Sequence, residues 1–144
     1  HIVAMDATQR PRPDGNTLNS MLKALQQQCP KTLLMADVAS LDEGLNAQKL
    51  GFNCVSTTLA GYTAQTQACS PSSTPDFNLL SALCQQLSIP VFLEGRVWSP
   101  EEVTTAFLYG AHAVVIGSAI TRPHVITQRF VQASQMCQLK PTRP

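Results

Sequence analysis

Glu94 is the residue of this sequence that is best suited to acid and base chemistry. It ends the apolar run "VFLE" and is followed at once by Gly95 and Arg96. Burial raises the pKa of a carboxyl group toward neutrality, which is useful for a general acid or base. From the residues alone, Glu94 is therefore either a catalytic acid or base or, more commonly at such a position, a solvated or helix-capping acid. Arg96 is expected to bind a phosphate or a sugar, or to form an ion pair.

The segment "VVIGSAITRP" has the residue types of a phosphate-binding loop. Gly117 follows an apolar run and leaves room for close approach of the backbone, and Ser118 begins a stretch whose amide hydrogens can face an anion. Arg122 adds a planar set of hydrogen-bond donors. Together with Gly95, these residues predict a phosphate site. The alternative is a tight strand-to-helix turn, with Pro123 at the start of the helix.

Two aspartates close other apolar runs. Asp37 ends "LLMAD" and Asp6 ends "VAMD". From the residues alone, Asp37 is either a site residue or a charge that interacts favourably with the N-terminal dipole of a helix. Asp6 faces the same choice. Arg10 and Arg12, in the proline-rich loop that follows it, either reach the site or are solvated.

Alternating strands and helices must position these residues. Apolar runs with strand character cover residues 1–8, 32–38, 52–58, 91–94 and 112–117. Helical periodicity fills the intervals, with Pro75 able to open the third helix, and a last helix is expected over residues 122–137. Nearly continuous apolar strands separated by helices predict a parallel sheet covered by helices.

A weak internal repeat supports this interpretation. Ser40, Glu43 and Gly51 stand at the same offsets as Ser99, Glu102 and Gly110. Each set predicts a helix N-cap, the reciprocal glutamate of a capping box, and a glycine past the end of the helix. Two copies of a strand, a capped helix and a second strand are therefore expected.

Such units build either a doubly wound open sheet or a (β/α)8 barrel. The sequence contains neither a GxGxxG nor a Walker A pattern, so the barrel is the better prediction. The C-terminal ends of barrel strands carry the active site, and Asp6, Asp37, Thr57, Glu94 and Gly117 fall at those ends.

The composition of the chain argues against several classes of protein, among them nucleic-acid-binding, membrane and disulfide-rich proteins. The chain has 144 residues, 44% hydrophobic and 13% charged, with a net charge of +1, so we expect neither a nucleic-acid nor a membrane partner. The five cysteines are scattered without CxxC pairs, which favours reduced thiols and a cytoplasmic protein over disulfides or a zinc site. The three histidines have no metal-binding spacing, so no metal is expected.

Four blocks of the chain resemble the N-acetylmannosamine-6-phosphate 2-epimerase family. They are "AMDATQRPRP", "MADVASLDEGLNAQKLGFNCVSTTLAGYT", "EGRVWSPEE" and "VVIGSAITRPHVITQRF". The resemblance covers almost the whole chain and keeps the order of the blocks. It implies a (β/α)8 barrel and interconversion of N-acetylmannosamine 6-phosphate with N-acetylglucosamine 6-phosphate in sialic-acid catabolism. That chemistry moves a proton on the carbon next to a carbonyl and requires no redox cofactor.

The resemblance also implies roles for residues. The glutamate of the EGR motif acts in the family with a lysine on an early strand, and this glutamate corresponds to Glu94. The aspartate that corresponds to Asp37 contacts the substrate. The lysine belongs to a segment without a counterpart here, because His1 precedes what corresponds to the fourth strand. We therefore expect residues 1–144 to form one partial barrel domain, strands 4 to 8, that is inactive alone.

Two other functions stay open at this point. One is a different phosphate-binding barrel enzyme, and the other is a non-catalytic remnant that binds sugar phosphates. A partial barrel also leaves strand edges and apolar surface that need cover, and a homodimer is one arrangement that would provide it.

Overall fold

Five parallel strands form one sheet, in the order in which they occur along the chain. The computed structural model describes residues 1–67 and 73–138. The strands are β1 (Ile2–Asp6), β2 (Leu33–Asp37), β3 (Cys54–Ser56), β4 (Val91–Glu94) and β5 (Ala113–Val115). Each strand pairs with its neighbour in sequence. This arrangement confirms the predicted α/β fold and fits five consecutive units of a (β/α)8 barrel.

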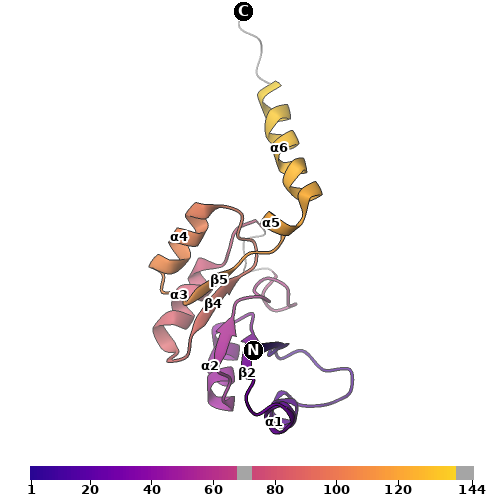
Figure 1. The fold of residues 1–144 in the computed structure, drawn as a ribbon, viewed down its shortest axis with the longest axis vertical. Coiled ribbons are helices and arrows are strands. Elements are labelled where there is room, and N and C mark those ends of the chain that lie inside the picture. Colours follow the sequence, from indigo (N-terminus) through magenta and orange to yellow (C-terminus); the bar gives the residue numbers. More distant parts are fainter. Residues whose placement is uncertain (68–72, 139–144) are drawn as a thin grey trace, which may run out of the picture.

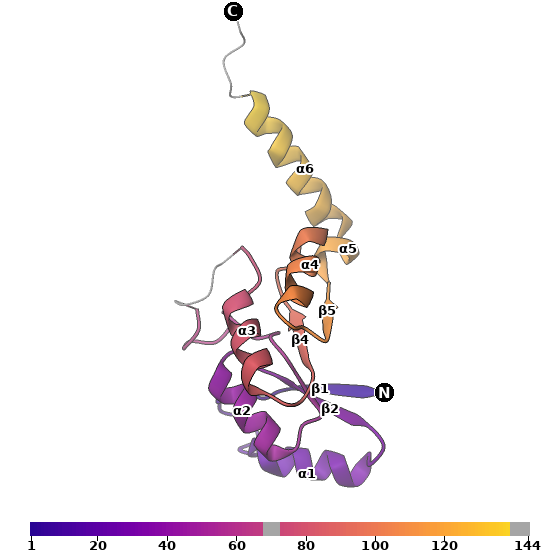
Figure 2. The same cartoon turned by 90° about the vertical axis from the view of Figure 1, so that its left-hand side faces the viewer.

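Helices connect the strands and continue beyond the last one. They are α1 (Leu18–Gln28), α2 (Leu41–Leu50), α3 (Phe77–Gln86), α4 (Pro100–Leu108), α5 (Ser118–Thr121) and α6 (Pro123–Gln138). Helices α1 to α4 each link two successive strands, as predicted. Helix α6 points away from the sheet, which gives the molecule an elongated shape (Figures 1 and 2).

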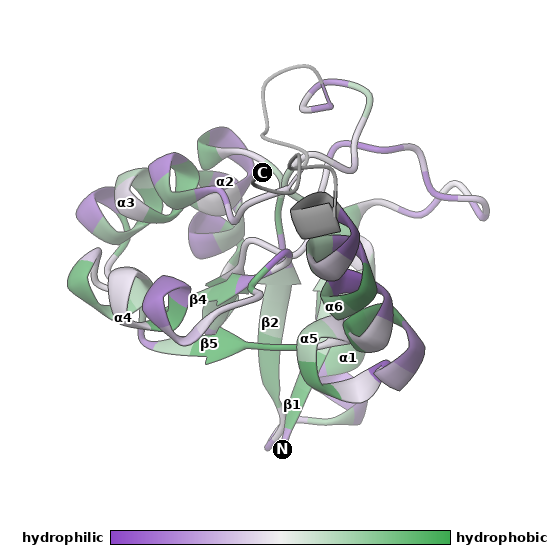
Figure 3. Cartoon of the chain, turned by 90° about the horizontal axis from the view of Figure 1, so that it is seen from above, coloured by the Kyte–Doolittle hydropathy of each residue, from purple (hydrophilic) through white to green (hydrophobic). Residues whose placement is uncertain are grey.

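The two faces of the sheet have different roles. Leu34, Ala36 and Leu93 belong to the buried core that the helices cover. Because neighbouring residues of a strand point to opposite faces, Asp37 and Glu94 project from the other face. Viewed from above, the strands are predominantly hydrophobic and α2, α3 and α4 lie to one side of them (Figure 3).

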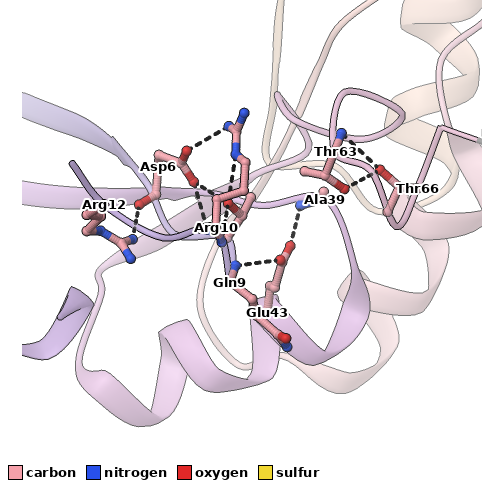
Figure 4. Close-up of polar contacts among 9 residues, drawn as sticks. Asp6, Gln9, Arg10, Arg12, Ala39, Glu43, Thr63 and Thr66 are labelled. Carbon is pink, nitrogen blue, oxygen red and sulfur yellow. Dashed lines mark hydrogen bonds and ion pairs between the residues drawn. The ribbon is translucent and has the colours of Figure 1, made fainter. Parts of the chain in front are cut away.

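The sequence repeat is only partly reproduced. Ser99 and Glu102 form the complete capping box of α4, but Glu43 does not close the box of α2. Its two carboxylate oxygens accept hydrogen bonds from the backbone N–H groups of Gln9, at 3.0 Å, and of Ala39, at 2.8 Å (Figure 4). The reciprocal role predicted for Glu43 is therefore wrong, because this side chain joins two loops instead.

Two further details concern helix ends. Gly51 and Gly110 both have left-handed backbone, with φ of 93° and 94°, as the repeat predicted. Helix α3 begins after Asp76, whose side chain accepts a hydrogen bond from Leu79 N. Pro75 therefore precedes the N-cap and does not open the first turn. An N-cap acceptor satisfies an amide that the helix itself cannot, which is why the aspartate sets the boundary.

The two outer strands of the described sheet expose apolar side chains. Ile2 and Val3 of β1 are 48% and 40% exposed, and Val115 of β5 is 38% exposed. Cys29, Cys54 and Cys84 are free thiols, whereas Cys69 and the side chain of Cys137 lie outside the described residues. Across the described helices, none has the length and apolar character needed to cross a membrane.

Candidate active site

Carboxylates from β1, β2 and β4 gather at one edge of the sheet, with Ser56 of β3 between the last two. Asp6 is paired in register with Asp37, and Asp37 with Ser56 of β3. Glu94 ends β4, which pairs with β3. All are at the carboxyl ends of parallel strands, so a single edge collects them, as the sequence predicted.

The hydroxyl of Thr58 lies between two of these carboxylates. Its Oγ1 is 2.8 Å from Asp37 Oδ1 and 3.1 Å from Glu94 Oε2. The Ser56 hydroxyl lies 2.8 Å from Thr58 Oγ1 and 3.4 Å from Glu94 Oε2. A short chain of hydroxyl groups therefore connects Asp37 on β2 with Glu94 on β4.

The pKa of Asp37 is raised above its ordinary value. Burial of the carboxyl group is the main cause, and the hydrogen bond from Thr58 opposes it. The negative charges of Glu94 and Asp6 raise the pKa further. Charge on Asp37 is therefore disfavoured by its surroundings, which is a common property of functional carboxylates.

The backbone at the end of β4 is held by a neighbouring threonine. Thr57 Oγ1 donates to the carbonyl oxygen of Glu94 and accepts from its backbone N–H, both at 3.0 Å. Beyond Glu94 the chain turns through two left-handed residues, Gly95 with φ of 103° and Arg96 with φ of 59°. Left-handed backbone is costly for a residue with a side chain and often marks functional sites.

Glu94 lines a pocket of about 270 Å³ together with Gly95, Arg96, Gly117 and Ser118. Thr58, Tyr62, Val97, Trp98, Val115 and Ala119 complete its wall. The structure thus brings together most of the residues that the sequence singled out. Asp37 is not part of the wall and reaches it through Thr58. Arg122 is exposed. It lies directly after α5 and is not among the residues that line this pocket.

Arg96 ties the pocket to the loop that follows β3. Its guanidinium donates to the carbonyl oxygens of Thr74, at 3.0 Å, and Ala60, at 2.8 Å. It also lies 5.3 Å from the centre of the Tyr62 ring, within range of a cation–π contact. Its predicted contact with a phosphate or sugar stays a prediction.

Asp6 is engaged by the loop that follows β1. Arg10 forms an ion pair with its carboxylate at 2.7 Å, and Arg12 donates to its carbonyl oxygen at 2.7 Å (Figure 4). Burial alone would raise the pKa of Asp6, but hydrogen bonds from Thr8 and the charge of Arg10 leave it below the ordinary value. Both arginines therefore bind Asp6 at the end of β1. The surroundings of Asp6 stabilise its negative charge, whereas those of Asp37 disfavour the charge of Asp37.

Sequence reasoning missed Thr58, Ser56 and Glu43 as parts of this site. Hydroxyl residues are common after strands, so their types alone carry little information. The available signal was position, since Ser56 and Thr58 follow the same apolar run and have the alternation of one face of a strand. Within residues 1–67 and 73–138, no group of three or more His, Cys, Asp or Glu side chains is arranged to hold a metal ion.

Comparison with known proteins gives one consistent family. The family model described as "Putative N-acetylmannosamine-6-phosphate epimerase" matches residues 1–136. A "Putative N-acetylmannosamine-6-phosphate 2-epimerase" of Caldanaerobacter subterraneus is 48% identical over 131 residues, which are 90% of this chain and 54% of that protein. One of the same name from Enterobacter sp. is 51% identical over 132 residues, covering 92% of this chain and 56% of the relative.

Solved structures agree. The N-acetylmannosamine-6-phosphate 2-epimerase of Clostridium perfringens superposes with a TM-score of 0.85 at 45% identity, over 92% of this chain and 56% of that one. FabK from Thermotoga maritima, at 18% identity and a TM-score of 0.59, covers 82% of this chain and 33% of its own and shares the fold alone. The chain spans a little more than half the length of the curated relatives named above. On these matches, the chain belongs to the N-acetylmannosamine-6-phosphate epimerase family.

Proposed function

We propose that this chain carries the Glu94 part of the active site of an epimerase that interconverts N-acetylmannosamine 6-phosphate and N-acetylglucosamine 6-phosphate. The observation that supports it best is the position of Glu94. Its carboxylate lines a pocket at the carboxyl edge of a parallel sheet, in a chain of the epimerase family.

The reaction inverts the carbon that bears the acetamido group, next to the carbonyl of the open-chain sugar. A base removes the proton from one face, the electron pair passes into an enolate, and an acid returns a proton to the other face. Glu94 is the group proposed to exchange the proton on one face. A positioned acid or base contributes about 10²- to 10⁴-fold to such a step.

The other predicted site residues are assigned to substrate binding. Gly117 and Ser118 line the same pocket as Glu94, and their backbone is proposed to hold the phosphate there. Arg122 is proposed to reach this phosphate as a charge-assisted donor. Arg96 with Gly95 shapes the wall, and Asp37 is proposed to contact the sugar.

We extend the proposal to the organisation of the whole protein. Residues 1–144 would form a single domain whose strands β1 to β5 correspond to strands 4 to 8 of a (β/α)8 barrel. Exposed apolar side chains on β1 and β5 support a homodimer as one means of covering these strands. A cytoplasmic location suits a phosphorylated substrate, because its charge prevents it from crossing a membrane.

The proposal is tested by following exchange of the C2 hydrogen in D2O, which reports proton removal even when the net reaction is slow. The chain is assayed alone and joined to the part of the Clostridium perfringens enzyme that it does not cover, with each of the two sugar phosphates as substrate in turn. We expect exchange in the joined protein. Glu94→Gln should lower the exchange rate by about 10²- to 10⁴-fold for the epimer whose C2 hydrogen faces Glu94, with sugar-phosphate binding retained.

Glu101→Gln is the matched control, because Glu101 is an exposed acid on the neighbouring α4. It should leave exchange unchanged. Glu94→Gln rates within a factor of about three of the parent for both sugar phosphates would remove Glu94 from this role. Binding of the sugar phosphate without any exchange in the joined protein would favour a binding module over an enzyme.

A further inference from the structure

The Thr58 hydroxyl has one hydrogen but three possible hydrogen-bond partners. It lies within hydrogen-bond distance of Asp37 Oδ1 at 2.8 Å, Ser56 Oγ at 2.8 Å and Glu94 Oε2 at 3.1 Å. A hydroxyl group donates one hydrogen and accepts through its lone pairs. At any moment Thr58 can therefore donate to one carboxylate only, and the other must go without this bond.

The ionisation of one carboxylate decides where that hydrogen goes. A charged carboxylate oxygen is the stronger acceptor, so the hydrogen prefers the group that carries the charge. When Glu94 is charged, it competes with Asp37 for the hydrogen. When Glu94 is neutral, Thr58 donates fully to Asp37. Ser56 can accompany either arrangement, since its own hydroxyl reaches Thr58 or Glu94.

The remaining charges around Asp37 do not provide such a switch. Asp6 faces it from β1 and is already paired with Arg10 at 2.7 Å. Cys54, on β3, is a buried thiol whose pKa is raised by burial and by the charge of Asp37. Glu94, at the end of β4, is the second carboxylate within reach of the Thr58 hydroxyl. The exchange of the hydrogen therefore takes place between Asp37 and Glu94.

We propose that Thr58 is a positioning residue that couples the charge of Asp37 to that of Glu94 by redirecting its single hydroxyl hydrogen. Coulomb repulsion already links two neighbouring carboxylates, and the hydrogen strengthens this link. For catalysis, which rests on the proposed function, the consequence is direct. When Glu94 takes up a proton from substrate, the hydrogen moves to Asp37 and stabilises its charge, so Asp37 remains an acceptor for the sugar during the step.

The test follows Asp37 alone, without substrate, so its outcome does not depend on epimerase activity. The 144-residue chain is labelled with carbon-13 in its aspartate carboxyl groups, and the Asp37 signal, assigned with Asp37→Asn, is titrated by NMR. Glu94→Gln removes the competing charge. In the Thr58 chain we expect this change to lower the midpoint of Asp37 by about one pH unit. In Thr58→Val the same change should lower it by less than half as much.

Two matched variants separate the hydroxyl from the shape of the side chain. Thr58→Ser keeps the hydroxyl and should restore the full effect of Glu94→Gln. Ser56→Ala removes the neighbouring hydroxyl, which has no hydrogen bond to Asp37 among those of the described residues, and should leave most of the effect in place. Loss of the effect in Ser56→Ala would assign the coupling to Ser56 and overturn the proposal.

Equal shifts in the Thr58 and Thr58→Val chains would also overturn it, because they would show that repulsion alone links the two groups. Should Thr58→Val not give a folded amide spectrum, Thr58→Ala replaces it. The parent chain gives an independent decision: an Asp37 midpoint that does not respond to Glu94→Gln excludes any coupling.

Discussion

At the scale of single residues, Asp37 shows a conflict between stability and function. Burial and the charges of Glu94 and Asp6 raise its pKa, so the folded state holds a proton on Asp37 more tightly than the unfolded state does. Above the folded pKa the charged form therefore costs stability. As the pH falls below the folded pKa, Asp37 takes up a proton in the folded state first, so this cost shrinks and is gone below the pKa of the unfolded chain.

We predict that Asp37→Asn stabilises the protein at pH 7. The amide keeps an oxygen that can accept from Thr58 and carries no charge. The melting temperature should rise by roughly 2–4 °C, the change that about 1 kcal/mol produces in a domain of this size. The gain should shrink as the pH falls below the raised pKa of Asp37 and vanish below the ordinary value of 3.8, since Asp37 of the parent is then neutral in both the folded and the unfolded state.

Thermal melts of both proteins at a series of pH values provide the measurement. Asp14→Asn is the control, on an exposed acid whose pKa is lowered by hydrogen bonds from Asn16, so it should not stabilise the protein at pH 7. A lower melting temperature of Asp37→Asn at pH 7 would contradict the prediction. It would mean that charged Asp37 is stabilised in the folded state.

At the scale of elements, the same Ser–Glu spacing serves two purposes in α2 and α4. Glu102 uses one oxygen, Oε2, to accept from the backbone N–H groups of both Trp98 and Ser99. Glu43 uses both oxygens, one for Gln9 and one for Ala39. Glu43 is also buried, at 8% exposure. Only Glu43 therefore holds together two loops at the edge that carries the site.

We predict that Glu43→Gln destabilises the protein more than Glu102→Gln. A glutamine has one acceptor oxygen, which can replace Oε2 of Glu102 for both of its partners. At position 43 its amide nitrogen would face a backbone N–H, and a buried donor would lose its acceptor at a cost of about 1–3 kcal/mol. Urea denaturation of the two variants measures the difference. Equal losses would show that Glu43 acts as an ordinary cap.

The sequence predicted elements better than it predicted the partners of side chains. Runs of apolar residues and helix caps are local signals, and they located all five strands and the capped starts of α2 and α4. The partner of Glu43, Gln9, is 34 residues away, so no local spacing reveals it. The offset that Glu43 shares with Glu102 predicted the wrong bond for this reason.

The candidate site shows the same limit. Glu94, Gly95, Gly117 and Ser118 could be predicted to meet, because each follows a strand and parallel strands end at one edge. The hydroxyl bridge depends on the directions of the Thr58 and Glu94 side chains, and these two residues are 36 positions apart in the sequence. Such directions follow from the packed sheet and not from residue types.

At the scale of the whole molecule, the described sheet has two outer strands with exposed apolar side chains. β1 and β5 each have one strand neighbour within residues 1–67 and 73–138. Unpaired backbone groups and exposed valines on outer strands promote pairing between chains. We predict that the purified 144-residue chain self-associates, and that light scattering gives a mass above that of one chain.

Charged substitutions provide the control. Lysine at the edge of a sheet opposes pairing, so Val3→Lys and Val115→Lys should lower the measured mass. Gln128→Lys, on the projecting α6, should not. A parent chain that is monodisperse and monomeric would contradict the prediction and would indicate that these strands are not the sites of association.

The sequential order of the strands also implies an order of assembly. Each strand pairs with the one made just before it, so a chain emerging from the ribosome can add one unit at a time without waiting for distant segments. Asp37 meets Thr58 across 21 residues, and Glu94 joins them only after another 36. During synthesis, the hydroxyl is therefore committed to Asp37 first, and competition for it begins when β4 docks.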